Sequence, residues 1–567
     1  MDTFLQAEPQ IPNLWADDDF LRAVLRSLGP QLLADADFVS QVNELGNRCA
    51  SRGDITQMGL LAERNCPRLT HYSAFGHRID DLWVSPYWKQ LQDVSAEYGL
   101  VATGYERRRF GDRARLAQFT KMYIFYAASA CFSCPLAMTD GAARLLELYA
   151  RSPDAEEKLR RLTSTDPREF ITSGQHMTER TGGSDLAHSE TIARRLDDGA
   201  YALTGYKFFT SAVSSEMAIV LARIVDDNGQ STSGSRGLSC FLLPLERDAE
   251  TKQLKGIVVH RLKDKLGNRA VPTAELEYAE CRGFLLGDAG RGVPVISCLF
   301  NLTRWQNAVH CVSSMRRVMA TVQSHARLRS VFGAKLTEKP LHVEIVADME
   351  LETRAATLLV AHTSLLLGKE ESNSHTKAEG SLLRLLTPLC KLYTAKQSIY
   401  VCSEGIECLG GVGFCEDSDM PRHFRDAQVT PVWEGTTNVL SLDVWRALGK
   451  ESSLPIFLSD IRRLCGSTFV TEAVHAIESA CVEIERAAAA SSRDQKVLET
   501  SAREFAYSMA RTYIAALFVH HATSTRDAAD AECARRWVSK HSPLGPRGVF
   551  DQAHREMSLK IGLKSKL

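Results

Sequence analysis

The chain has 567 residues, with 68 Lys and Arg against 69 Asp and Glu, and its hydrophobic share is 44%. These values are typical of a globular protein with several domains, and they exclude a disordered, collagen-like or disulfide-stapled chain. The net charge of -1 provides no overall attraction to nucleic acid or to an anionic membrane surface. Composition therefore favours an enzyme or a scaffold protein.

Residues 1–170 are predicted to form an N-terminal helical domain. The first fifteen residues are acidic and lack the features of a secretion signal or a transit peptide. Apolar residues then recur at three- and four-residue steps from Phe20 to Leu28, and a second helical run covers residues 119–149. Ser152 followed by Pro153 is typical of a capped helix start.

The fifteen cysteines are scattered along the chain. An odd, dispersed set favours free thiols in a reducing compartment over a disulfide framework. Cys131 and Cys134 have the spacing of a redox pair or half a zinc site, but their apolar, helical surroundings favour ordinary buried cysteines. No His, Asp, Glu and Cys cluster has metal-ligand spacing, so we expect no metal.

Residues 171–286 are predicted to form a central antiparallel β domain. Residues 191–196, the turn Asp197–Gly199 and residues 201–204 indicate a hairpin. Further strands are indicated at 218–224, 238–243, 256–261 and 274–278, most of them separated by polar loops. The pattern predicts an α+β protein.

Helical periodicity returns over residues 287–450, which predicts a C-terminal helical bundle, and a loop is indicated from Gly449 to Pro455. Residues 451–567 are predicted to form an added helical extension. The chain ends in Ser565-Lys566-Leu567, a peroxisomal address, so we expect a peroxisomal protein bound by the import receptor. No apolar run is long enough for a membrane span.

Several motifs that are weak singly become specific in their order along the chain. Gly410 and Gly411 do not match the dinucleotide-binding fingerprint, because the spacing and the flanks are wrong. The motifs are Met177 to Asp185 (MTERTGGSD), Gly205 to Ser211, Lys265 to Arg269, Arg329 to Gly333, Leu409 to Phe414 and Trp433 to Asn438. Together they resemble the acyl-CoA dehydrogenase flavoprotein family over about residues 60–450. The long N-terminal lead, the Trp-Glu-Gly form and the C-terminal extension are most similar to its AidB-like branch.

The resemblance implies an enzyme that forms a 2,3-double bond in an acyl-CoA. Such a reaction needs a carboxylate for the α proton, a flavin for the β hydride, and donors for the thioester oxygen. Glu434 is the implied base, and burial beside Trp433 and Gly435 would raise the pKa of its carboxyl. Some family members carry the base on the helix after the β domain, where this chain has Thr303, which cannot act as a base at neutral pH.

The same resemblance implies FAD as the cofactor, in a homodimer or homotetramer whose subunits share it. Ser184 is implied to contact the pantetheine arm and Arg304 the CoA, although a structural salt bridge fits Arg304 equally well. His176, just before the first motif, either tunes the flavin or is structural, and the structural role is favoured. The implied FAD contacts are Met177, Thr178, Phe209, Ser211, Arg329, Phe332, Gly410, Gly411, Thr436 and Asn438.

Three alternative functions remain open at this stage. A peroxisomal acyl-CoA oxidase would return the electrons to O₂, and the C-terminal address makes this reading serious. An AidB-like flavoprotein that associates with nucleic acid, with little turnover, is the second. The nearly balanced charge of the extension disfavours it, and no nucleic-acid partner is expected. A poorly active flavoprotein that stores or sequesters acyl-CoA is a third possibility, but the presence of Glu434 favours catalysis. The electron acceptor and the acyl-chain length are left undetermined by the sequence.

Overall fold

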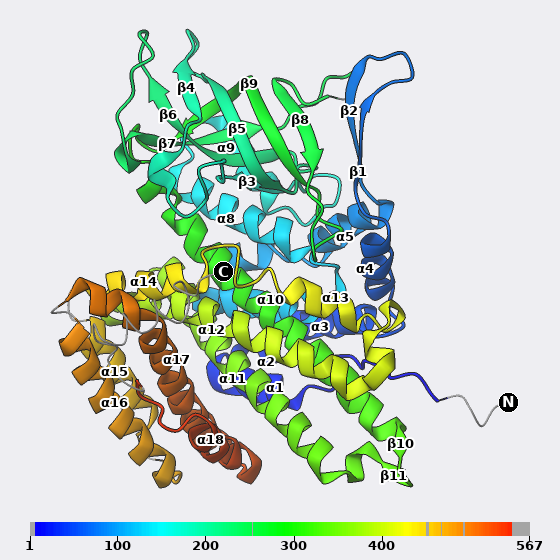
Figure 1. Ribbon diagram of the computed structural model, residues 1–567, viewed down its shortest axis with the longest axis vertical. Coiled ribbons are helices and arrows are strands. Elements are labelled where there is room, and N and C mark those ends of the chain that lie inside the picture. Colours follow the sequence, from blue (N-terminus) through cyan, green and yellow to red (C-terminus); the bar gives the residue numbers. More distant parts are fainter. Residues whose placement is uncertain (1–5, 252, 450–452, 467, 492–493, 547–567) are drawn as a thin grey trace, which may run out of the picture.

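The computed structural model describes residues 6–251, 253–449, 453–466, 468–491 and 494–546. A β domain lies at one end of the molecule (Figure 1). The rest consists of helices, which come from the chain segments before and after the β domain. The arrangement of N-terminal helices, central β domain, C-terminal helical bundle and helical extension is the one predicted. None of the described helices has the length and apolarity needed to cross a lipid bilayer.

The N-terminal helices begin where side chains can cap them. Asp18, Asp35 and Ser152 each accept a hydrogen bond from the backbone N–H three residues on, which satisfies a donor that the helix leaves free. The helices are α1 (Asp19–Leu28), α2 (Pro30–Ala34), α3 (Ala36–Cys49), α4 (Asp54–Arg64), α5 (Pro86–Glu97), α6 (Arg107–Phe110), α7 (Ala114–Phe125), α8 (Ser133–Tyr149) and α9 (Pro153–Leu162).

The sequence pattern did not reveal a hairpin within this helical domain. Strands β1 (Arg68–Tyr72) and β2 (Arg78–Trp83) pair antiparallel and project as an arm beside the β domain (Figure 1). In β1 exposed and half-buried side chains alternate, and the one buried side chain of β2 is the charged Asp80, so the strands lack the apolar face that would have marked them.

The described β domain contains a seven-stranded sheet in the order β3-β6-β4-β5-β9-β7, with β8 paired to β9 and β6 also paired to β7. The predicted hairpin is confirmed, with Arg195 opposite Tyr201. The purely antiparallel expectation is wrong for two pairs, because β3 and β4 both run parallel to β6. The strands are β3 (Ser173–His176), β4 (Ile192–Arg195), β5 (Tyr201–Ser211), β6 (Met217–Val225), β7 (Leu238–Pro244), β8 (Ile257–Leu262) and β9 (Thr273–Leu286).

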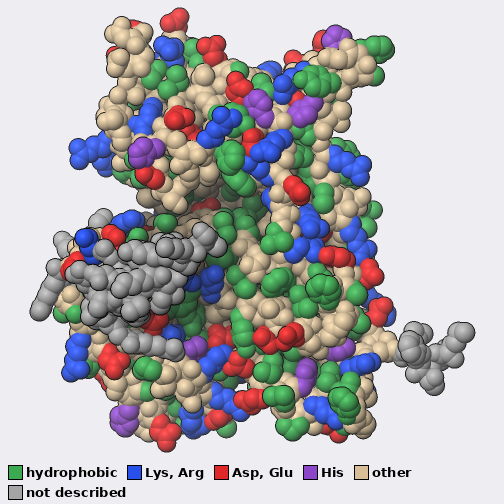
Figure 2. All heavy atoms as spheres, viewed as in Figure 1, with side chains coloured by type: hydrophobic (Ala, Val, Ile, Leu, Met, Phe, Trp, Pro, Cys, Tyr) green, Lys and Arg blue, Asp and Glu red, His purple; other side chains and the backbone are tan. Residues whose placement is uncertain are grey.

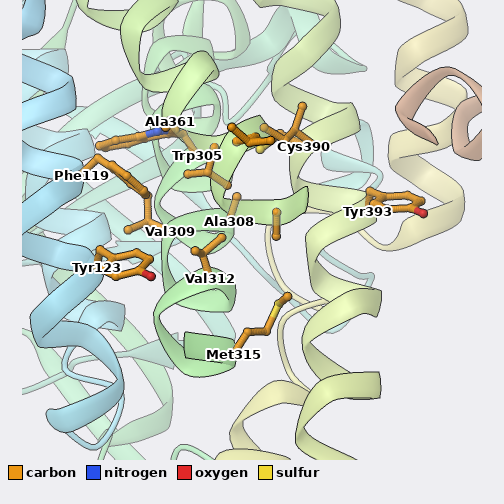
Figure 3. Packing of buried hydrophobic residues seen from close by; sticks show 14 of the residues in the cluster. Phe119, Tyr123, Trp305, Ala308, Val309, Val312, Met315, Ala361, Cys390 and Tyr393 are labelled. Atoms are coloured by element: carbon orange, nitrogen blue, oxygen red, sulfur yellow. The ribbon is translucent and has the colours of Figure 1, made fainter. Parts of the chain in front are cut away.

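Three long helices form the centre of the molecule: α10 (Gly292–Leu328), α11 (Pro340–Glu371) and α12 (Lys377–Leu409). A short hairpin, β10 (Ser330–Val331) and β11 (Ala334–Lys335), connects the first two. Figure 3 shows their core, where Trp305, Val309 and Val312 of α10 pack between α7 and the other long helices. Because α10 is covered on nearly all sides, it can carry chemical groups into the interior of the protein.

The remaining helices are α13 (Met420–Ala427) and α14 (Thr437–Leu448), followed by the extension, α15 (Ser453–Leu464), α16 (Thr471–Ser491), α17 (Gln495–Thr525) and α18 (Ala528–Lys540). The predicted loop after Gly449 is shorter than expected, because α15 already begins at Ser453. Trp445 of α14 stacks on Phe505 of α17, which packs the extension against the bundle. The terminal Ser565-Lys566-Leu567 lies outside the described residues.

Candidate active site

A cavity of about 780 Å³ lies between the β domain and the long helices. Its walls come from α8, the loop after β3, strand β5, the loop before β9, helix α10 and the segment from α13 to α14. The surface in Figure 2 is hollowed between the β domain above and the helices below. The cavity unites segments far apart in the sequence, and seven of the predicted site residues line it: Met177, Thr178, Ser184, Phe209, Ser211, Arg304 and Glu434.

The β-domain wall presents an aromatic face and hydroxyl groups. Phe209 is 44% exposed, which is unusual for a large apolar side chain on a central strand. Thr178 forms a β-bridge to Phe209, so the first motif and β5 face the cavity together. Such a surface suits a flat aromatic ligand that also needs hydrogen bonds.

Two residues of the first motif explain why its backbone takes this shape. The buried Glu179 carboxylate accepts hydrogen bonds from Lys207 at 2.7 Å and from the Thr191 hydroxyl at 2.6 Å, which anchors the loop to the sheet. A Cβ at Gly183 would lie 2.6 Å from the Thr178 hydroxyl oxygen, so only glycine fits there. Glu179 therefore has a structural role, although it is a carboxylate within a motif that lines the cavity.

Ser211 is part of a hydrogen-bonded series of polar side chains. Its hydroxyl lies 3.1 Å from that of Thr273, which accepts a hydrogen bond from Lys265 Nζ at 3.0 Å. The Lys265 ammonium also donates to the Val271 carbonyl at 2.7 Å. The third sequence motif thus supplies a cation to the cavity wall, a role that sequence reasoning missed.

Glu434 lies on the helical side of the cavity, in the turn before α14. Its backbone φ is 56°, a left-handed value rare for a residue with a side chain, and Gly435 follows with a φ of 98°. The carboxylate Oε2 accepts a hydrogen bond from the Thr303 hydroxyl of α10 at 2.5 Å. Backbone strain of this kind clusters where a side chain must be aimed for function.

Burial raises the pKa of the Glu434 carboxyl above its ordinary value. The hydrogen bond from Thr303 and the charges of Arg304 and Lys391 offset only part of that increase. Among the described residues no cation forms a direct ion pair with this carboxylate. A desolvated carboxylate aimed into a cavity is suited to accept a proton.

Arg304 lines the cavity, and its guanidinium is held by hydrogen bonds to neighbouring protein groups. It donates to Asp443 of α14 at 2.8 Å and to the Glu434 carbonyl at 3.4 Å. Arg384 of α12 binds the same Asp443 carboxylate at 2.8 Å. The structural salt bridge considered for Arg304 is therefore present, and it ties the turn of Glu434 to two long helices.

Asn307 fixes Trp433, the aromatic residue that precedes Glu434. Its side chain accepts a hydrogen bond from the Trp433 indole N–H at 2.7 Å and donates to the Thr430 carbonyl at 3.1 Å. Asn307 is 3% exposed and lies one helical turn after Thr303. A buried amide amid the apolar residues of a helix was the available sequence signal for this role.

Deeper in the cavity, α10 contributes further polar side chains. Gln306 donates to Asp140 at 2.6 Å, and Asp140 forms a buried ion pair with Arg115 at 2.8 Å. His310 hydrogen-bonds Ser133 at 3.0 Å, and burial lowers its pKa to about 3, so it is neutral. Ser133, Gln306 and His310 thus give this part of the wall neutral polar groups, and the Asp140–Arg115 ion pair lies behind Gln306.

The other six predicted cofactor residues do not line this cavity. Arg329 and Phe332 lie at the connection between α10 and α11, where Phe332 is 98% exposed. Gly410 and Gly411 are exposed at the end of α12. Thr436 caps α14, and Asn438 accepts a hydrogen bond from Arg503 of the extension. Arg329 is predicted to reach the FAD of a neighbouring subunit, and all six contacts stay predictions.

His176 is a structural residue of the β domain. It is fully buried, it does not line the cavity, and its Nδ1 lies 2.7 Å from the Tyr278 hydroxyl. Cys131 and Cys134 are both buried free thiols. No group of three His, Cys, Asp or Glu side chains within the described parts of the chain could hold a metal ion.

Family models match nearly the whole chain. The N-terminal domain of the adaptive response protein AidB matches residues 7–166, and the acyl-CoA dehydrogenase middle and C-terminal domains match residues 174–281 and 290–449. The acyl-CoA dehydrogenase 11 C-terminal domain-like model matches residues 454–548. With the fold and the relatives below, these matches show that the chain belongs to the acyl-CoA dehydrogenase family and is an enzyme of that class.

Among its relatives is acyl-CoA dehydrogenase family member 11 of Caenorhabditis elegans, 40% identical over 553 residues, which span 94% of this chain and 88% of the relative. The putative acyl-CoA dehydrogenase AidB of Escherichia coli is 32% identical over 75% of this chain and 76% of its own length. The crystal structure of C. elegans ACDH-11 in complex with C11-CoA superposes with a TM-score of 0.95 at 38% identity, covering 100% of this chain and 98% of that one.

Proposed function

We propose that this protein is an FAD-dependent acyl-CoA dehydrogenase that forms a 2,3-double bond in an acyl-CoA, with Glu434 as the base. The carrying observation is the Glu434 carboxylate, desolvated and aimed into a cavity whose opposite wall bears Phe209, Thr178 and Ser211. Removal of a weakly acidic α proton needs a base whose pKa lies closer to neutral than that of a solvated carboxylate. Burial provides that shift for Glu434.

The residues of the cavity fit a flavin. Phe209 offers an exposed aromatic face, and the Thr178 and Ser211 hydroxyls lie on the same wall. Four buried polar atoms of lining residues have no partner in the structure, as expected where a polar ligand completes the hydrogen bonds; they are Gln175 Oε1, Asn268 Oδ1, His310 Nε2 and Arg425 Nε. Bound FAD would supply the acceptor for two electrons and the β hydrogen.

Each protein group then has a defined task. Glu434 takes the α proton, and the Thr303 hydroxyl orients its carboxylate. Trp433 is fixed by Asn307 and lines the cavity, and its proposed task is to shield the base from water. Arg304 holds the turn through Asp443. Ser184 lines the cavity, and we assign it to the pantetheine arm.

The proposed substrate is an acyl-CoA of medium or greater length. The related C. elegans ACDH-11 was crystallised in complex with C11-CoA, and C11-CoA is therefore the first compound to test here. The proposed assembly is a homodimer or a homotetramer. Strongly exposed apolar side chains at Phe332, Leu341 and Phe414 support an interface between copies of the chain.

The deciding experiment mixes the FAD-loaded protein with C11-CoA without oxygen and follows flavin absorbance. Bleaching that requires the acyl-CoA supports the proposal, and an oxidised spectrum at saturating C11-CoA would overturn it for this substrate class. The same mixture in air separates the two acceptors. Rapid hydrogen peroxide release would identify an acyl-CoA oxidase, whereas bleached flavin that persists until an electron carrier is added identifies a dehydrogenase.

We also propose that the protein acts in peroxisomes, in fatty-acid or specialised acyl-chain metabolism. The support is the terminal Ser565-Lys566-Leu567. A fluorescent protein fused to the N-terminus of the full chain should mark peroxisomes, and deletion of Leu567 should disperse the signal. Equal distribution of both fusions would contradict the proposed location without affecting the proposed reaction.

A further inference from the structure

Lys391 is a buried lysine outside every motif discussed above. It lies in the middle of α12, its side chain has no solvent exposure, and its Nζ donates to the Gly435 carbonyl at 2.6 Å. Among the ion pairs of the described residues none includes Lys391. A buried ammonium without a paired carboxylate is costly to maintain, which indicates that it serves a purpose beyond packing.

The Gly435 carbonyl belongs to the turn that aims the base. Glu434 has a left-handed backbone conformation, which is costly for a residue with a side chain, so contacts that hold this turn stabilise the strained residue. Arg304 donates to the carbonyl of Glu434, and Lys391 donates to the next carbonyl. Two cations, one from α10 and one from α12, thus hold two successive carbonyls of this turn.

We infer that Lys391 is a positioning residue for the base. Its hydrogen bond to Gly435 holds the turn that presents Glu434, and its positive charge favours the ionised form of the Glu434 carboxylate. The inference rests on the proposed function, since it gives Lys391 a part in α-proton abstraction. It assigns to α12 a role that none of the sequence motifs contains.

The charge state of Lys391 follows from its surroundings. Burial lowers its pKa to about 8, so the side chain is mainly protonated at neutral pH. The described titratable groups acting on it are Cys311 and Arg304 of α10, Lys396 of α12 and Glu434 itself. Cys311 and Glu434 favour the ammonium form, whereas Arg304 and Lys396 oppose it.

The test compares Lys391→Met with Lys121→Met in the FAD-loaded protein. Lys121 is a matched control, because it is 3% exposed, burial lowers its pKa to about 8, and it donates to the Tyr98 carbonyl at 2.8 Å. It does not line the cavity. The readout is the rate of flavin bleaching by C11-CoA as a function of pH.

In Lys391→Met we expect the bleaching rate at neutral pH to fall about tenfold or more. The acidic limb of its pH profile, where the bleaching rate falls as the pH is lowered, should move to higher pH by about one unit. The reason is the loss of a positive charge that favoured the ionised carboxylate. The affinity for C11-CoA should change less than about threefold. Lys121→Met should leave the limb where it is in the wild type, even where it lowers thermal stability. An unmoved limb in Lys391→Met would refute the electrostatic role.

Two further variants separate geometry from charge and cover the case in which Lys391→Met does not fold. Lys391→Arg retains the cation and should keep the limb within about 0.3 units of the wild type. Lys391→Gln retains an N–H donor without the charge and should shift the limb as Lys391→Met does. If Gln and Arg give the same limb, the inference is wrong. Failure of the proposed function is recognised separately, because the wild type itself would then not bleach.

Discussion

Two glutamates in different regions of the molecule have pKa values shifted in opposite directions. Burial raises the pKa of Glu434, and a hydroxyl with two cations that act at a distance offsets only part of the effect. Burial acts in the same direction on Glu352 of α11, but His541 and Lys540 more than offset it, and its pKa is about 2. The contrast lies in the partners, since desolvation raises the pKa of both carboxyls.

Glu352 has a complete set of partners where the extension meets the bundle. It accepts from Gln397 at 2.6 Å and pairs with Lys540, the last residue of α18, at 2.7 Å. Glu434 has a hydroxyl on one oxygen and a cavity beside it. A carboxylate saturated with donors stabilises an interface, whereas one left short of donors at a cavity retains the capacity to bind a proton.

The largest expected effect follows from substituting the carboxylate at the cavity. In Glu434→Gln the rate of flavin bleaching by C11-CoA should fall about a hundred- to ten-thousandfold, because the amide cannot accept the α proton. Flavin binding should be retained, as measured by absorbance after gel filtration. Bleaching at the wild-type rate would remove Glu434 from the mechanism.

The same variant has an expected stability signature. Because the folded-state pKa of Glu434 is raised, this carboxyl stabilises the fold below its unfolded-state pKa and loses that contribution as the pH rises through the folded-state value. Glu434→Gln should therefore be at least as stable as the wild type at pH 7 in thermal unfolding. A clearly lower midpoint would show that the carboxylate also has a structural partner.

The second prediction concerns Glu352, the carboxylate with a complete set of hydrogen-bond donors. Glu352→Ala should lower the free energy of unfolding of the extension by about 2–3 kcal/mol. The value is below that for a fully buried pair, because Lys540 is 28% exposed and keeps Asp348 as a partner at 2.7 Å. Hydrogen exchange over α18 in urea would measure it. The rate of flavin bleaching in the folded variant should stay within about twofold of the wild type.

An exposed pair in the same extension provides the control. Arg462 and Glu478 are both nearly half exposed, so Glu478→Ala should cost less than about 1 kcal/mol. The Glu352 contribution is present above the ordinary pKa of 4.5 and is lost as the pH falls toward about 2. If the two variants destabilise α18 equally, burial of the carboxylate does not set the strength of this contact.

The sequence motifs named the proposed base, Glu434, but not the residues that surround it. Glu434, Met177 and Ser211 lie within short motifs whose order along the chain is specific, so the two facing walls of the cavity could be named in advance. Thr303 is 131 residues from Glu434, and Lys391 is 44 residues from Gly435. Nothing in the local pattern of α10 or α12 distinguishes the side of the helix that meets this turn.

For the fold too, the sequence predicted the local elements but not the contacts between distant ones. Helical and strand periods located most elements, because each is encoded within about ten residues. The parallel pairing of β3 and β4 with β6 depends on how the first motif loops out between these strands, which periodicity does not record. Glu352 appeared as one more charge on a long helix, because its partner Lys540 lies in an extension that packs back onto the bundle.

The smallest expected effect concerns the single hydrogen bond to the base. Thr303→Val removes the donor at 2.5 Å from the Glu434 carboxylate while nearly preserving volume. Because that bond lowers the pKa of Glu434, its loss should move the acidic limb of the bleaching profile upward by about half a unit to one unit, with several-fold slower bleaching below pH 6. At high pH the two rates should converge.

The matched control is Thr120→Val, a buried threonine of α7 whose hydroxyl bonds only the Leu116 carbonyl of its own helix, at 2.9 Å. It should leave the limb unmoved. A Thr303→Val profile that is lowered equally at every pH would mean that the hydroxyl aims the carboxylate without changing its proton affinity. In that case the Thr303 hydroxyl would act on the position of the Glu434 carboxylate and not on its pKa, unlike His541 and Lys540, which lower the pKa of Glu352.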